Sequence, residues 1–277
     1  MTIPRCEATD AWANLALPGT LEKSAEVERL FRQARSAHVL DRGISGEETV
    51  AMMDRAGMRH AVVTVWHTRG SWQSSDDKVR EMVRRFPGRF VGAVSLNPER
   101  PRRAVDQLRA AVEQHGFKAL RLVPWLYGRP PSDPRFYPLY AACVELGIPL
   151  CTQVGHTGPL MSSEPGRPIP YLERVAIDFP DLRIVGGHLG YPWTDEMIAL
   201  AAKFANVHID TSAHLPKYYP TSLLQFMRGA GRTKVLFATN FPMLDMEKCR
   251  QQADRLDLPD DSLHAFLGGN ARRVFKL

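Results

Sequence analysis

The stretch that decides the fold is Leu182-Arg-Ile-Val-Gly-Gly-His-Leu-Gly-Tyr-Pro-Trp193. Its apolar β-forming residues end in two glycines and a histidine, and a helix is expected to begin at Pro192. This pattern predicts that His188 lies at the carboxyl end of a buried strand, where barrels and open α/β sheets keep their catalytic groups. The segment Lys234-Val-Leu-Phe-Ala-Thr-Asn-Phe-Pro242 predicts a second strand end, at Asn240. One end therefore offers an acid–base group and the other a neutral amide.

Eight short apolar runs recur along the chain, separated by amphipathic stretches. The runs are dense in Val, Ile, Leu and Phe rather than alternating, which is typical of a parallel sheet covered on both faces. Eight strand–helix units in 277 residues predict a distorted (β/α)8 TIM barrel. An open doubly wound sheet is the main competitor, but no G-x-G-x-x-G motif follows the first run. The runs are Glu7–Leu15, His60–Trp66, Phe90–Leu96, Phe117–Val123, Pro149–Gln153, Leu182–Gly187, Val207–Asp210 and Val235–Thr239.

Local signals place the helices. Ser45-Gly-Glu-Glu48 is a capping box, Asp133-Pro134 is an N-cap followed by proline, and glycines at 57, 116 and 147 are natural helix stops. An extra helix is expected over Leu21–Ala37, after the first strand, and a C-terminal helix over Pro259–Phe275. The chain has no linker, low-complexity tract or internal repeat, so we expect a single domain over residues 1–277.

Composition narrows the function classes. With 36 Lys and Arg against 30 Asp and Glu, the net charge is +6. This is consistent with anionic small molecules as ligands or with an ordinary solvated basic surface. No lysine-rich arm or aromatic and basic stripe predicts nucleic-acid binding. Four widely spaced cysteines favour a reduced protein over a disulfide framework or zinc knuckle. The chain shows neither a signal peptide nor an apolar run of about 20 residues, so the expectation is a cytoplasmic protein without a membrane partner.

Polar or aromatic residues stand at each predicted strand end. Two glycines before His188 let the backbone approach closely, which a solitary core histidine does not require, so we interpret His188 as functional. For Asn97, Thr211 and Ser212 a helix-capping or solvent-facing role is preferred. The full set at the strand ends is Trp12, Asn14, Trp66, His67, Asn97, Arg121, Gln153, His156, His188, Asp210, Thr211, Ser212 and Asn240.

From about Ser45 onward the chain resembles the amidohydrolase-2 family, which includes aminocarboxymuconate semialdehyde decarboxylase. The resemblance is carried by residues 178–193 (DFPDLRIVGGHLGYPW), 206–213 (NVHIDTSA), 234–242 (KVLFATNFP) and 268–275 (GGNARRVF). These motifs are specific for the family, not for a substrate. The resemblance implies a barrel enzyme that acts on a small molecule, usually through a metal ion, and an oligomer of identical chains.

The chain departs from that family at the metal ligands. Where metal-binding members carry a His-x-His pair, this sequence has Trp12 and Asn14, and the ligand histidine of strand five falls on Gln153. The ligand aspartate of strand eight is Asn240. Zinc prefers imidazole, thiolate or carboxylate, and amides or indole are poor substitutes. We therefore expect no metal and no other cofactor, although His156 and His188 leave a weak, water-assisted site open.

Without a metal, the substrate needs a carbonyl that is already electrophilic. The expected function is a hydrolase in which His188 activates water, assisted by His156, to cleave a C–C or ester bond. Arg121 and Asn240 then stabilise the enolate or oxyanion. Candidate substrates are lactones and β-ketoacyl-CoA compounds of aromatic catabolism, since relatives with Asn at this position resemble hydroxyphenyl-β-ketoacyl-CoA hydrolases. A metal-dependent decarboxylase and a non-catalytic ligand-binding barrel remain as alternatives. Expected substrate contacts are Trp12, Asn14, Trp66, His67, Gln153, Tyr191, Trp193 and Asp210.

Overall fold

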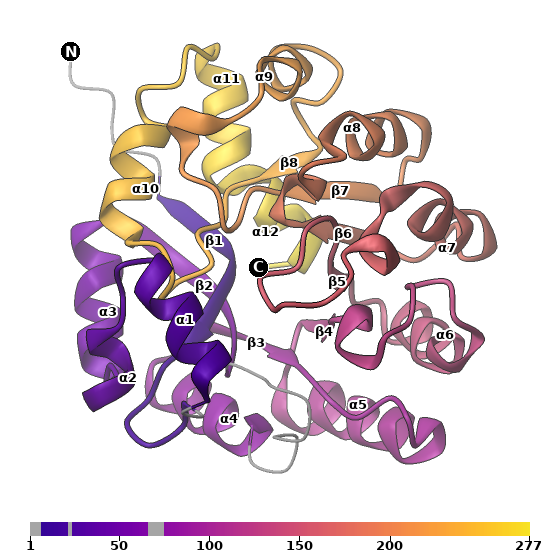
Figure 1. The fold of residues 1–277 in the computed structure, drawn as a ribbon, viewed down its shortest axis with the longest axis horizontal. Coiled ribbons are helices and arrows are strands. Elements are labelled where there is room, and N and C mark those ends of the chain that lie inside the picture. The colour runs from indigo at the N-terminus through magenta and orange to yellow at the C-terminus, as the bar shows by residue number, and fades with distance from the viewer. Residues whose placement is uncertain (1–6, 22–23, 66–74) are drawn as a thin grey trace.

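The chain folds into a barrel of eight parallel strands surrounded by helices (Figure 1). The computed structural model describes residues 7–21, 24–65 and 75–277. The strands pair in chain order, each with its successor. They are β1 (Ala8–Leu15), β2 (Met58–Val65), β3 (Phe90–Val94), β4 (Ala119–Leu122), β5 (Leu150–Gln153), β6 (Ile184–Gly187), β7 (Val207–Asp210) and β8 (Val235–Leu236). The predicted TIM barrel is confirmed.

Short hydrogen bonds close the barrel between β1 and the segment after β8. The Ala11 N–H donates to the Phe237 carbonyl at 2.9 Å, and the Asn240 N–H donates to the Trp12 carbonyl at 2.8 Å. Residues 13 and 241 form a parallel bridge at the same seam. The closure brings Asn240 to the same edge of the mouth as Trp12 and Asn14, although more than two hundred positions separate it from them in the sequence.

Twelve α-helices are found in the described part of the chain, and most lie outside the barrel, where they cover the strands (Figure 1). The segment between β1 and β2 holds three of them. The helices are α1 (Ala25–Gln33), α2 (His38–Arg42), α3 (Gly46–Arg55), α4 (Ser75–Arg85), α5 (Pro101–His115), α6 (Tyr137–Leu146), α7 (Glu173–Asp178), α8 (Thr194–Lys203), α9 (Thr221–Arg228), α10 (Met246–Ala253), α11 (Asp260–His264) and α12 (Asn270–Phe275). None of these helices is long and apolar enough to cross a bilayer.

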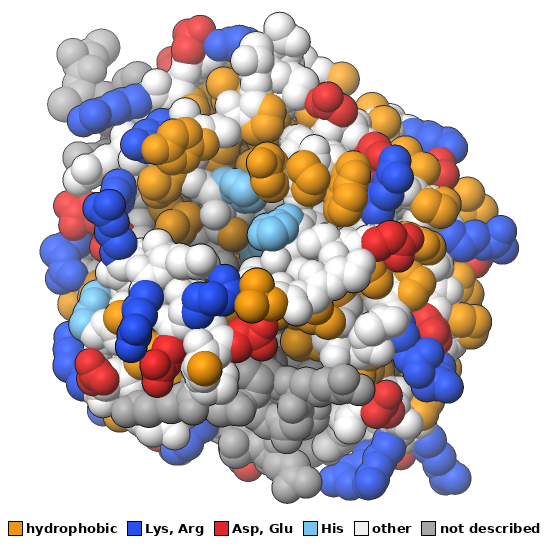
Figure 2. Space-filling view, viewed as in Figure 1, with side chains coloured by type: hydrophobic (Ala, Val, Ile, Leu, Met, Phe, Trp, Pro, Cys, Tyr) orange, Lys and Arg blue, Asp and Glu red, His pale blue; other side chains and the backbone are white. Residues whose placement is uncertain are grey.

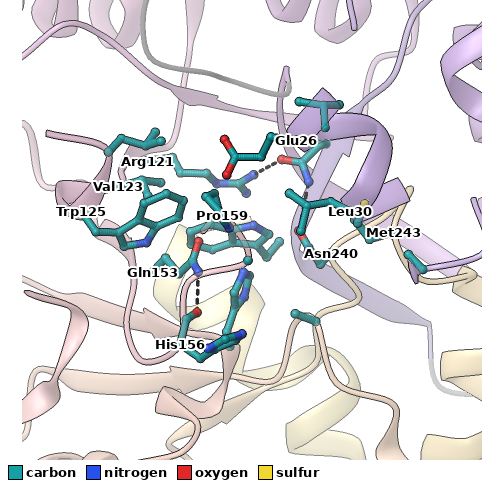
Figure 3. Close-up of a pocket in the computed structure, with 18 of the residues that line it drawn as sticks. Glu26, Leu30, Arg121, Val123, Trp125, Gln153, His156, Pro159, Asn240 and Met243 are labelled. Carbon is teal, nitrogen blue, oxygen red and sulfur yellow. Dashed lines mark hydrogen bonds between the residues drawn. The ribbon is translucent and has the colours of Figure 1, made fainter. Parts of the chain in front are cut away.

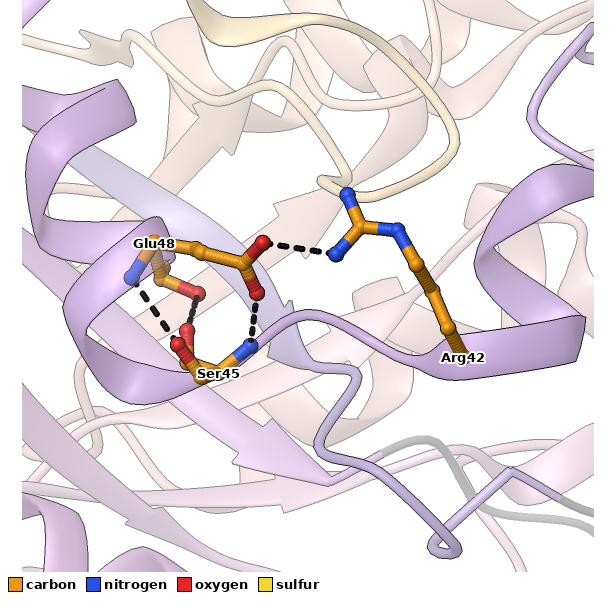
Figure 4. Close-up of polar contacts among 4 residues, drawn as sticks. Arg42, Ser45 and Glu48 are labelled. Atoms are coloured by element: carbon orange, nitrogen blue, oxygen red, sulfur yellow. Dashed lines mark hydrogen bonds and ion pairs between the residues drawn. The ribbon is translucent and has the colours of Figure 1, made fainter.

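The capping box predicted at Ser45 opens α3 (Figure 4). The Glu48 N–H donates to Ser45 Oγ at 3.1 Å, and the Ser45 N–H donates back to Glu48 Oε2 at 2.8 Å. Arg42 donates to the same carboxylate at 2.6 Å. Two otherwise unpaired helix donors are thereby satisfied, which fixes where the chain turns back toward β2.

Small residues fill the barrel interior and leave room for a helix beneath it. Ala11, Ala93 and Ala119 form an inner core together with the α12 residues Val274 and Phe275. Arg272 and Arg273 of α12 donate to the carbonyls of Glu7 and Thr233, which immediately precede β1 and the β8 region. The helix α12 therefore closes the amino end of the barrel, and only the carboxyl end remains open.

Two predicted helix boundaries were wrong. The extra helix expected over Leu21–Ala37 is shorter, at Ala25–Gln33, and a second helix, α2, follows it. The C-terminal helix expected over Pro259–Phe275 is present as a continuous helical run from Asp260 to Phe275, in which the turn Ala265–Gly269 is π-helical. The helix expected to begin at Pro192 begins at Thr194.

Candidate active site

A cavity of about 820 Å³ opens at the carboxyl end of the barrel. Its floor is formed by strand ends, and its upper walls come from α1, residues 158–161 and residues 243–244. Figure 2 shows histidine side chains in the hollow at the centre of this face, with hydrophobic side chains around them. Figure 3 shows lining residues that converge on the same space from several strands. The cavity lies where a TIM barrel holds its active site.

Eight of the predicted site residues line this cavity, while two do not. Trp66 and His67 lie outside the described residues. Asp210 is fully buried behind the cavity, and Trp193 stacks beneath Arg167, with the guanidinium carbon 5.8 Å from its ring centre. The structure therefore does not place Asp210 and Trp193, both expected as substrate contacts, at this cavity. Those that line the cavity are Trp12, Asn14, Arg121, Gln153, His156, His188, Tyr191 and Asn240.

The close backbone approach expected at the Gly186–Gly187 pair is present. A Cβ on Gly187 would lie 2.9 Å from Asp210 Oδ2 and 3.1 Å from a ring carbon of Trp12. The next residue, His188, takes the left-handed conformation with φ of 62°, which is uncommon for a side chain other than glycine or asparagine. This turn places the imidazole edge-on to the Trp12 ring, with the ring centres 5.3 Å apart.

A serine and an aspartate hold the His188 ring. His188 Nδ1 lies 2.5 Å from Ser212 Oγ, and the Ser212 hydroxyl in turn contacts Asp210 Oδ1. The carboxylate is the acceptor, so the serine proton points at Asp210 and the serine oxygen accepts from the Nδ1–H of histidine. This order of donors leaves the Nε2 lone pair of His188 facing the cavity, which is the arrangement that a general base needs.

Two backbone N–H groups also hold the Asp210 carboxylate in place. The His188 and Ser212 backbone N–H groups both donate to Asp210 Oδ1, at 3.3 and 2.9 Å. Asp210 Oδ2 is buried without a hydrogen-bond partner in the described structure. Burial raises the pKa of Asp210 to about 6, against the opposing effect of its hydrogen bonds with Ser212. Ser212, which sequence reasoning had assigned to capping or solvent, is therefore the link between strand seven and the candidate base.

The imidazole of His188 is neutral at neutral pH. Burial is the main cause that lowers its pKa to about 3, and the charges of His214, Arg121 and His156 act in the same direction. Burial also lowers the pKa of His214, which lines the cavity beside Tyr191 with ring centres 5.4 Å apart. Sequence reasoning missed His214, and its position four residues after the end of β7 was the only available signal.

Arg121 places a buried cation under the cavity floor. Its Nη1 donates to the Ala13 carbonyl at 2.8 Å and to Asn14 Oδ1 at 3.3 Å, and its Nη2 donates to the Val62 carbonyl at 3.0 Å. The guanidinium carbon lies 4.2 Å from the Trp12 ring centre, a cation–π contact. Burial lowers the pKa of Arg121 to about 10, so it stays charged at neutral pH. Because protein acceptors occupy much of the guanidinium, its effect on the cavity is chiefly electrostatic.

A second buried carboxyl lies on the first strand, at Asp10. Thr239 Oγ1 donates to its Oδ2 at 2.5 Å, and the N–H groups of Trp12 and Thr239 donate to its Oδ1, both at 3.0 Å. Burial raises the pKa of Asp10 to about 7. Asp10 therefore joins β1 to the segment after β8 and does not face the cavity.

The hydrogen-bond network also orients the amides at the floor. Asn14 Nδ2 donates to the Phe241 carbonyl at 3.0 Å and to Asn240 Oδ1 at 3.2 Å (Figure 3). Since the carbonyl can only accept, Asn240 must present its Nδ2 group to the cavity. Gln153 Nε2 donates to the His156 carbonyl at 3.1 Å, which leaves the Gln153 carbonyl oxygen toward the space. The floor therefore offers an amide N–H donor in the same cavity as the His188 ring.

The donor set at the strand ends does not suit a transition-metal ion. No three His, Cys, Asp or Glu side chains in the described ranges gather within ligand distance of one point. Trp12 and Asn14, at the positions where metal-binding members carry histidines, instead contact the Arg121 guanidinium. A resident cation and neutral amides at this edge oppose a divalent ion electrostatically and supply no soft or anionic ligand. We derive no chemistry through a metal.

The barrel and the polar carboxyl-end site define this class of protein as a TIM-barrel enzyme scaffold. The chain belongs to the amidohydrolase family, whose pattern it matches over residues 9–277. The predicted family is therefore confirmed.

A curated relative and two solved structures are similar to this chain. The 2-keto-4-carboxy-3-hexenedioate hydratase of Sphingobium sp. (strain NBRC 103272 / SYK-6) is 26% identical over 244 residues, covering 73% of this chain and 70% of the relative. An uncharacterised TIM-barrel protein from Bordetella bronchiseptica superposes with a TM-score of 0.83 at 23% identity, covering 98% of both chains. The 5-carboxyvanillate decarboxylase of Novosphingobium aromaticivorans, solved with manganese, gives a TM-score of 0.75 at 18% identity, covering 99% of this chain and 97% of that one. The curated relative is named as a hydratase and the manganese-bound structure as a decarboxylase, while the likeness to the two solved structures shows the barrel fold that they share with this chain.

Proposed function

We propose that this protein is a hydrolase that uses histidine-activated water, without a metal, to cleave a C–C or ester bond at an activated carbonyl. The observation that carries the proposal is the order Asp210–Ser212–His188, which leaves the His188 Nε2 lone pair toward the cavity. A barrel that only binds a ligand and has lost its catalytic activity does not need a base held in one tautomer. The amide donor of Asn240 beside it supplies a place for an oxyanion.

The proposed reaction consists of the attack of water on the carbonyl, followed by departure of the leaving group. His188 Nε2 takes a proton from water as the water oxygen attacks the carbonyl carbon, and the carbonyl oxygen becomes an oxyanion that accepts a hydrogen bond from Asn240 Nδ2. The bond from this carbon to the leaving group then breaks. Its electron pair becomes an enolate in a β-dicarbonyl substrate, or an alkoxide in a lactone. The imidazolium returns the proton to the leaving group, and His188 is regenerated.

Arg121 supports these steps through its fixed positive charge. Negative charge moves from the oxyanion to the leaving group, and a buried cation below the floor stabilises both. His156 lines the cavity on the loop after β5 and is the proposed second acid–base group. The roles of these residues follow from their positions around one space rather than from any single contact.

A hydratase is the second candidate, because the curated relative named above is one. Hydration uses the same base and the same water, which adds to a carbon–carbon double bond conjugated to a carbonyl. The proton returns to the neighbouring carbon instead of to a leaving group. Hydration and the cleavage of a β-dicarbonyl substrate both pass through an enolate, so the same floor serves either reaction.

The experiment tests both candidates on three substrate panels: β-ketoacyl-CoA compounds, lactones and unsaturated oxo acids. His188→Asn should lower kcat at least about 10²-fold, the lower end of what a general base contributes. The matched control is His115→Asn, which makes the same substitution at the end of α5, outside the cavity. Activity should persist in the presence of a chelator.

Each alternative has its own outcome. Tight binding without turnover on any panel would replace the proposal with a non-catalytic barrel. Loss of activity on chelation, with restoration by added Mn²⁺ or Zn²⁺, would replace it with a metal-dependent decarboxylase. Full activity of His188→Asn would show that the histidine on strand six is structural.

A further inference from the structure

The fixed charges around the cavity nearly cancel. Among the lining residues that the structure describes, Arg121 is the only arginine or lysine and Glu26 is the only carboxylate. Arg121 already donates to three protein oxygen atoms. Glu26 lies on α1 at the upper wall, where its carboxylate accepts from the Leu160 N–H at 2.8 Å. The described lining residues therefore present little net charge to a ligand, despite the net charge of +6 on the whole chain.

The upper walls are apolar and face solvent. The side chain of Leu160 is 83% exposed and that of Met161 is 41% exposed, yet both line the cavity. Leu30 of α1 and the pair Met243 and Leu244 line the same cavity. Exposed apolar side chains gathered at one opening are typical of a binding site for an apolar group.

Hydrogen bonds hold this rim in place. Arg29 of α1 donates to the Gly158 carbonyl at 2.7 Å, and Glu26 accepts from Leu160, so α1 and residues 158–161 are joined at two points. Gly158 lies so close to α1 that a Cβ there would be 3.0 Å from a methyl carbon of Leu30. The exposure of Leu160 is thus part of a fixed surface and not of a frayed loop.

We propose that the cavity selects a largely apolar acyl group that carries at most one negative charge. The inference rests on the proposed function for the position of the reacting carbonyl, which lies at the Asn240 and His188 floor. The apolar body then extends upward between α1 and residues 158–161. A second carboxylate on that body would meet Leu30, Leu160 and Met161, where no Lys or Arg among the described residues lines this part of the cavity and where the nearby Arg29 already donates to the Gly158 carbonyl, and it would lie on the same wall as Glu26.

The physical basis is the cost of moving a second charge out of water. A carboxylate that enters an apolar site without a partner loses its hydration and gains nothing in return, and a nearby like charge adds repulsion. The first carboxylate or the developing enolate escapes this cost, because the positive charge of Arg121 lies beneath the floor. Any charged carrier attached to the acyl group, such as a CoA moiety, stays outside the opening.

The test compares two stable probes that differ by one carboxylate, 3-phenylpropanoate and 4-(2-carboxyethyl)benzoate. Isothermal titration calorimetry on the full chain should give a Kd at least roughly tenfold lower for the first probe. Glu26→Gln keeps the oxygen that accepts from the Leu160 N–H but removes the charge. It should therefore lower the Kd of the second probe several-fold and bring the Kd values of the two probes closer together. Glu28→Gln is the matched control on the same helix, because Glu28 does not line the cavity and pairs with Arg32.

Three results would overturn the inference. The doubly charged probe could bind as tightly as the singly charged one. The Glu26→Gln and Glu28→Gln variants could change the ratio of the two probes' Kd values by the same factor. Both probes could fail to bind at millimolar concentration. None of these measurements involves turnover, so the inference and the His188 mechanism can fail independently of each other.

Discussion

Ser212→Ala tests whether the serine hydroxyl keeps His188 in its active tautomer. In the native structure the Nδ1–H of His188 donates to Ser212 Oγ, which is held by Asp210. Removal of the hydroxyl leaves a buried N–H without an acceptor, at a cost of roughly 1 to 3 kcal/mol. The ring can avoid this cost only by rotating or by moving the proton to Nε2, and either change removes the lone pair from the cavity.

This free energy sets the expected loss of activity. Since about 1.4 kcal/mol corresponds to a factor of ten in rate, kcat/KM should fall roughly 10- to 100-fold. The assay is steady-state kinetics on whichever panel compound the protein turns over. Ser212→Thr keeps a hydroxyl at the same atom and should restore most of the activity. ¹⁵N NMR of the histidine ring should show the proton on Nδ1 of His188 in the native protein and its displacement in Ser212→Ala.

Thr211→Val is the control for a merely structural effect. The neighbouring hydroxyl of Thr211 is equally buried, but it donates to the Leu236 carbonyl and accepts from the Ala238 N–H, both at 3.2 Å and away from His188. Thr211→Val should lower stability while leaving the His188 tautomer unchanged. The reasoning is refuted if Ser212→Ala loses no more activity than Thr211→Val, or if the native ring carries its proton on Nε2.

Two further predictions concern pH. The lowered pKa of His188 means that the base is already unprotonated well below pH 6.5, so the acid limb of kcat/KM should lie below that value; a limb near pH 6.5 in a rate profile would contradict this. Asp10 has a pKa raised by burial to about 7, so its contribution to stability is complete below about pH 4 and is lost as pH rises through 7. Asp10→Asn should therefore gain stability relative to the native protein between pH 5 and 8, by at most about 4 kcal/mol at 1.4 kcal/mol per pKa unit. Urea unfolding at both pH values measures this gain. If the free energy of unfolding changed with pH in the same way in the native protein and in Asp10→Asn, the buried protonated carboxyl would be contradicted.

The barrel was predictable because its signals are local. Dense apolar runs, glycine stops and the capping box at Ser45 each report on a few neighbouring residues, and eight repeats of the pattern leave few topologies for a parallel sheet. The bounds of the C-terminal helical run were predicted closely, but its π-helical turn over Ala265–Gly269 was not, because no local pattern in the sequence marked it.

The candidate site was predictable only to the level of the strand ends. Residues at the carboxyl ends of barrel strands meet at one mouth, and this rule was sufficient to predict that His188, Arg121 and Asn240 lie near one another. It did not reveal which side chains face the cavity. Asp210 and Trp193 both stand at or after strand ends, yet one turns into the core and the other packs under Arg167 on the outer surface.

The sequence by itself therefore determined the barrel, its family and the replacement of expected metal ligands by Trp12, Asn14, Gln153 and Asn240. Residue identity settles these matters, because an amide cannot become a strong metal ligand in any fold. Tertiary structure alone decided that Ser212 connects Asp210 to His188. These groups come from two adjacent strands, and the positive φ of His188 and the missing Cβ of Gly187 are what allow their side chains to meet. Such contacts depend on side-chain direction across the sheet, which no local pattern in the sequence records.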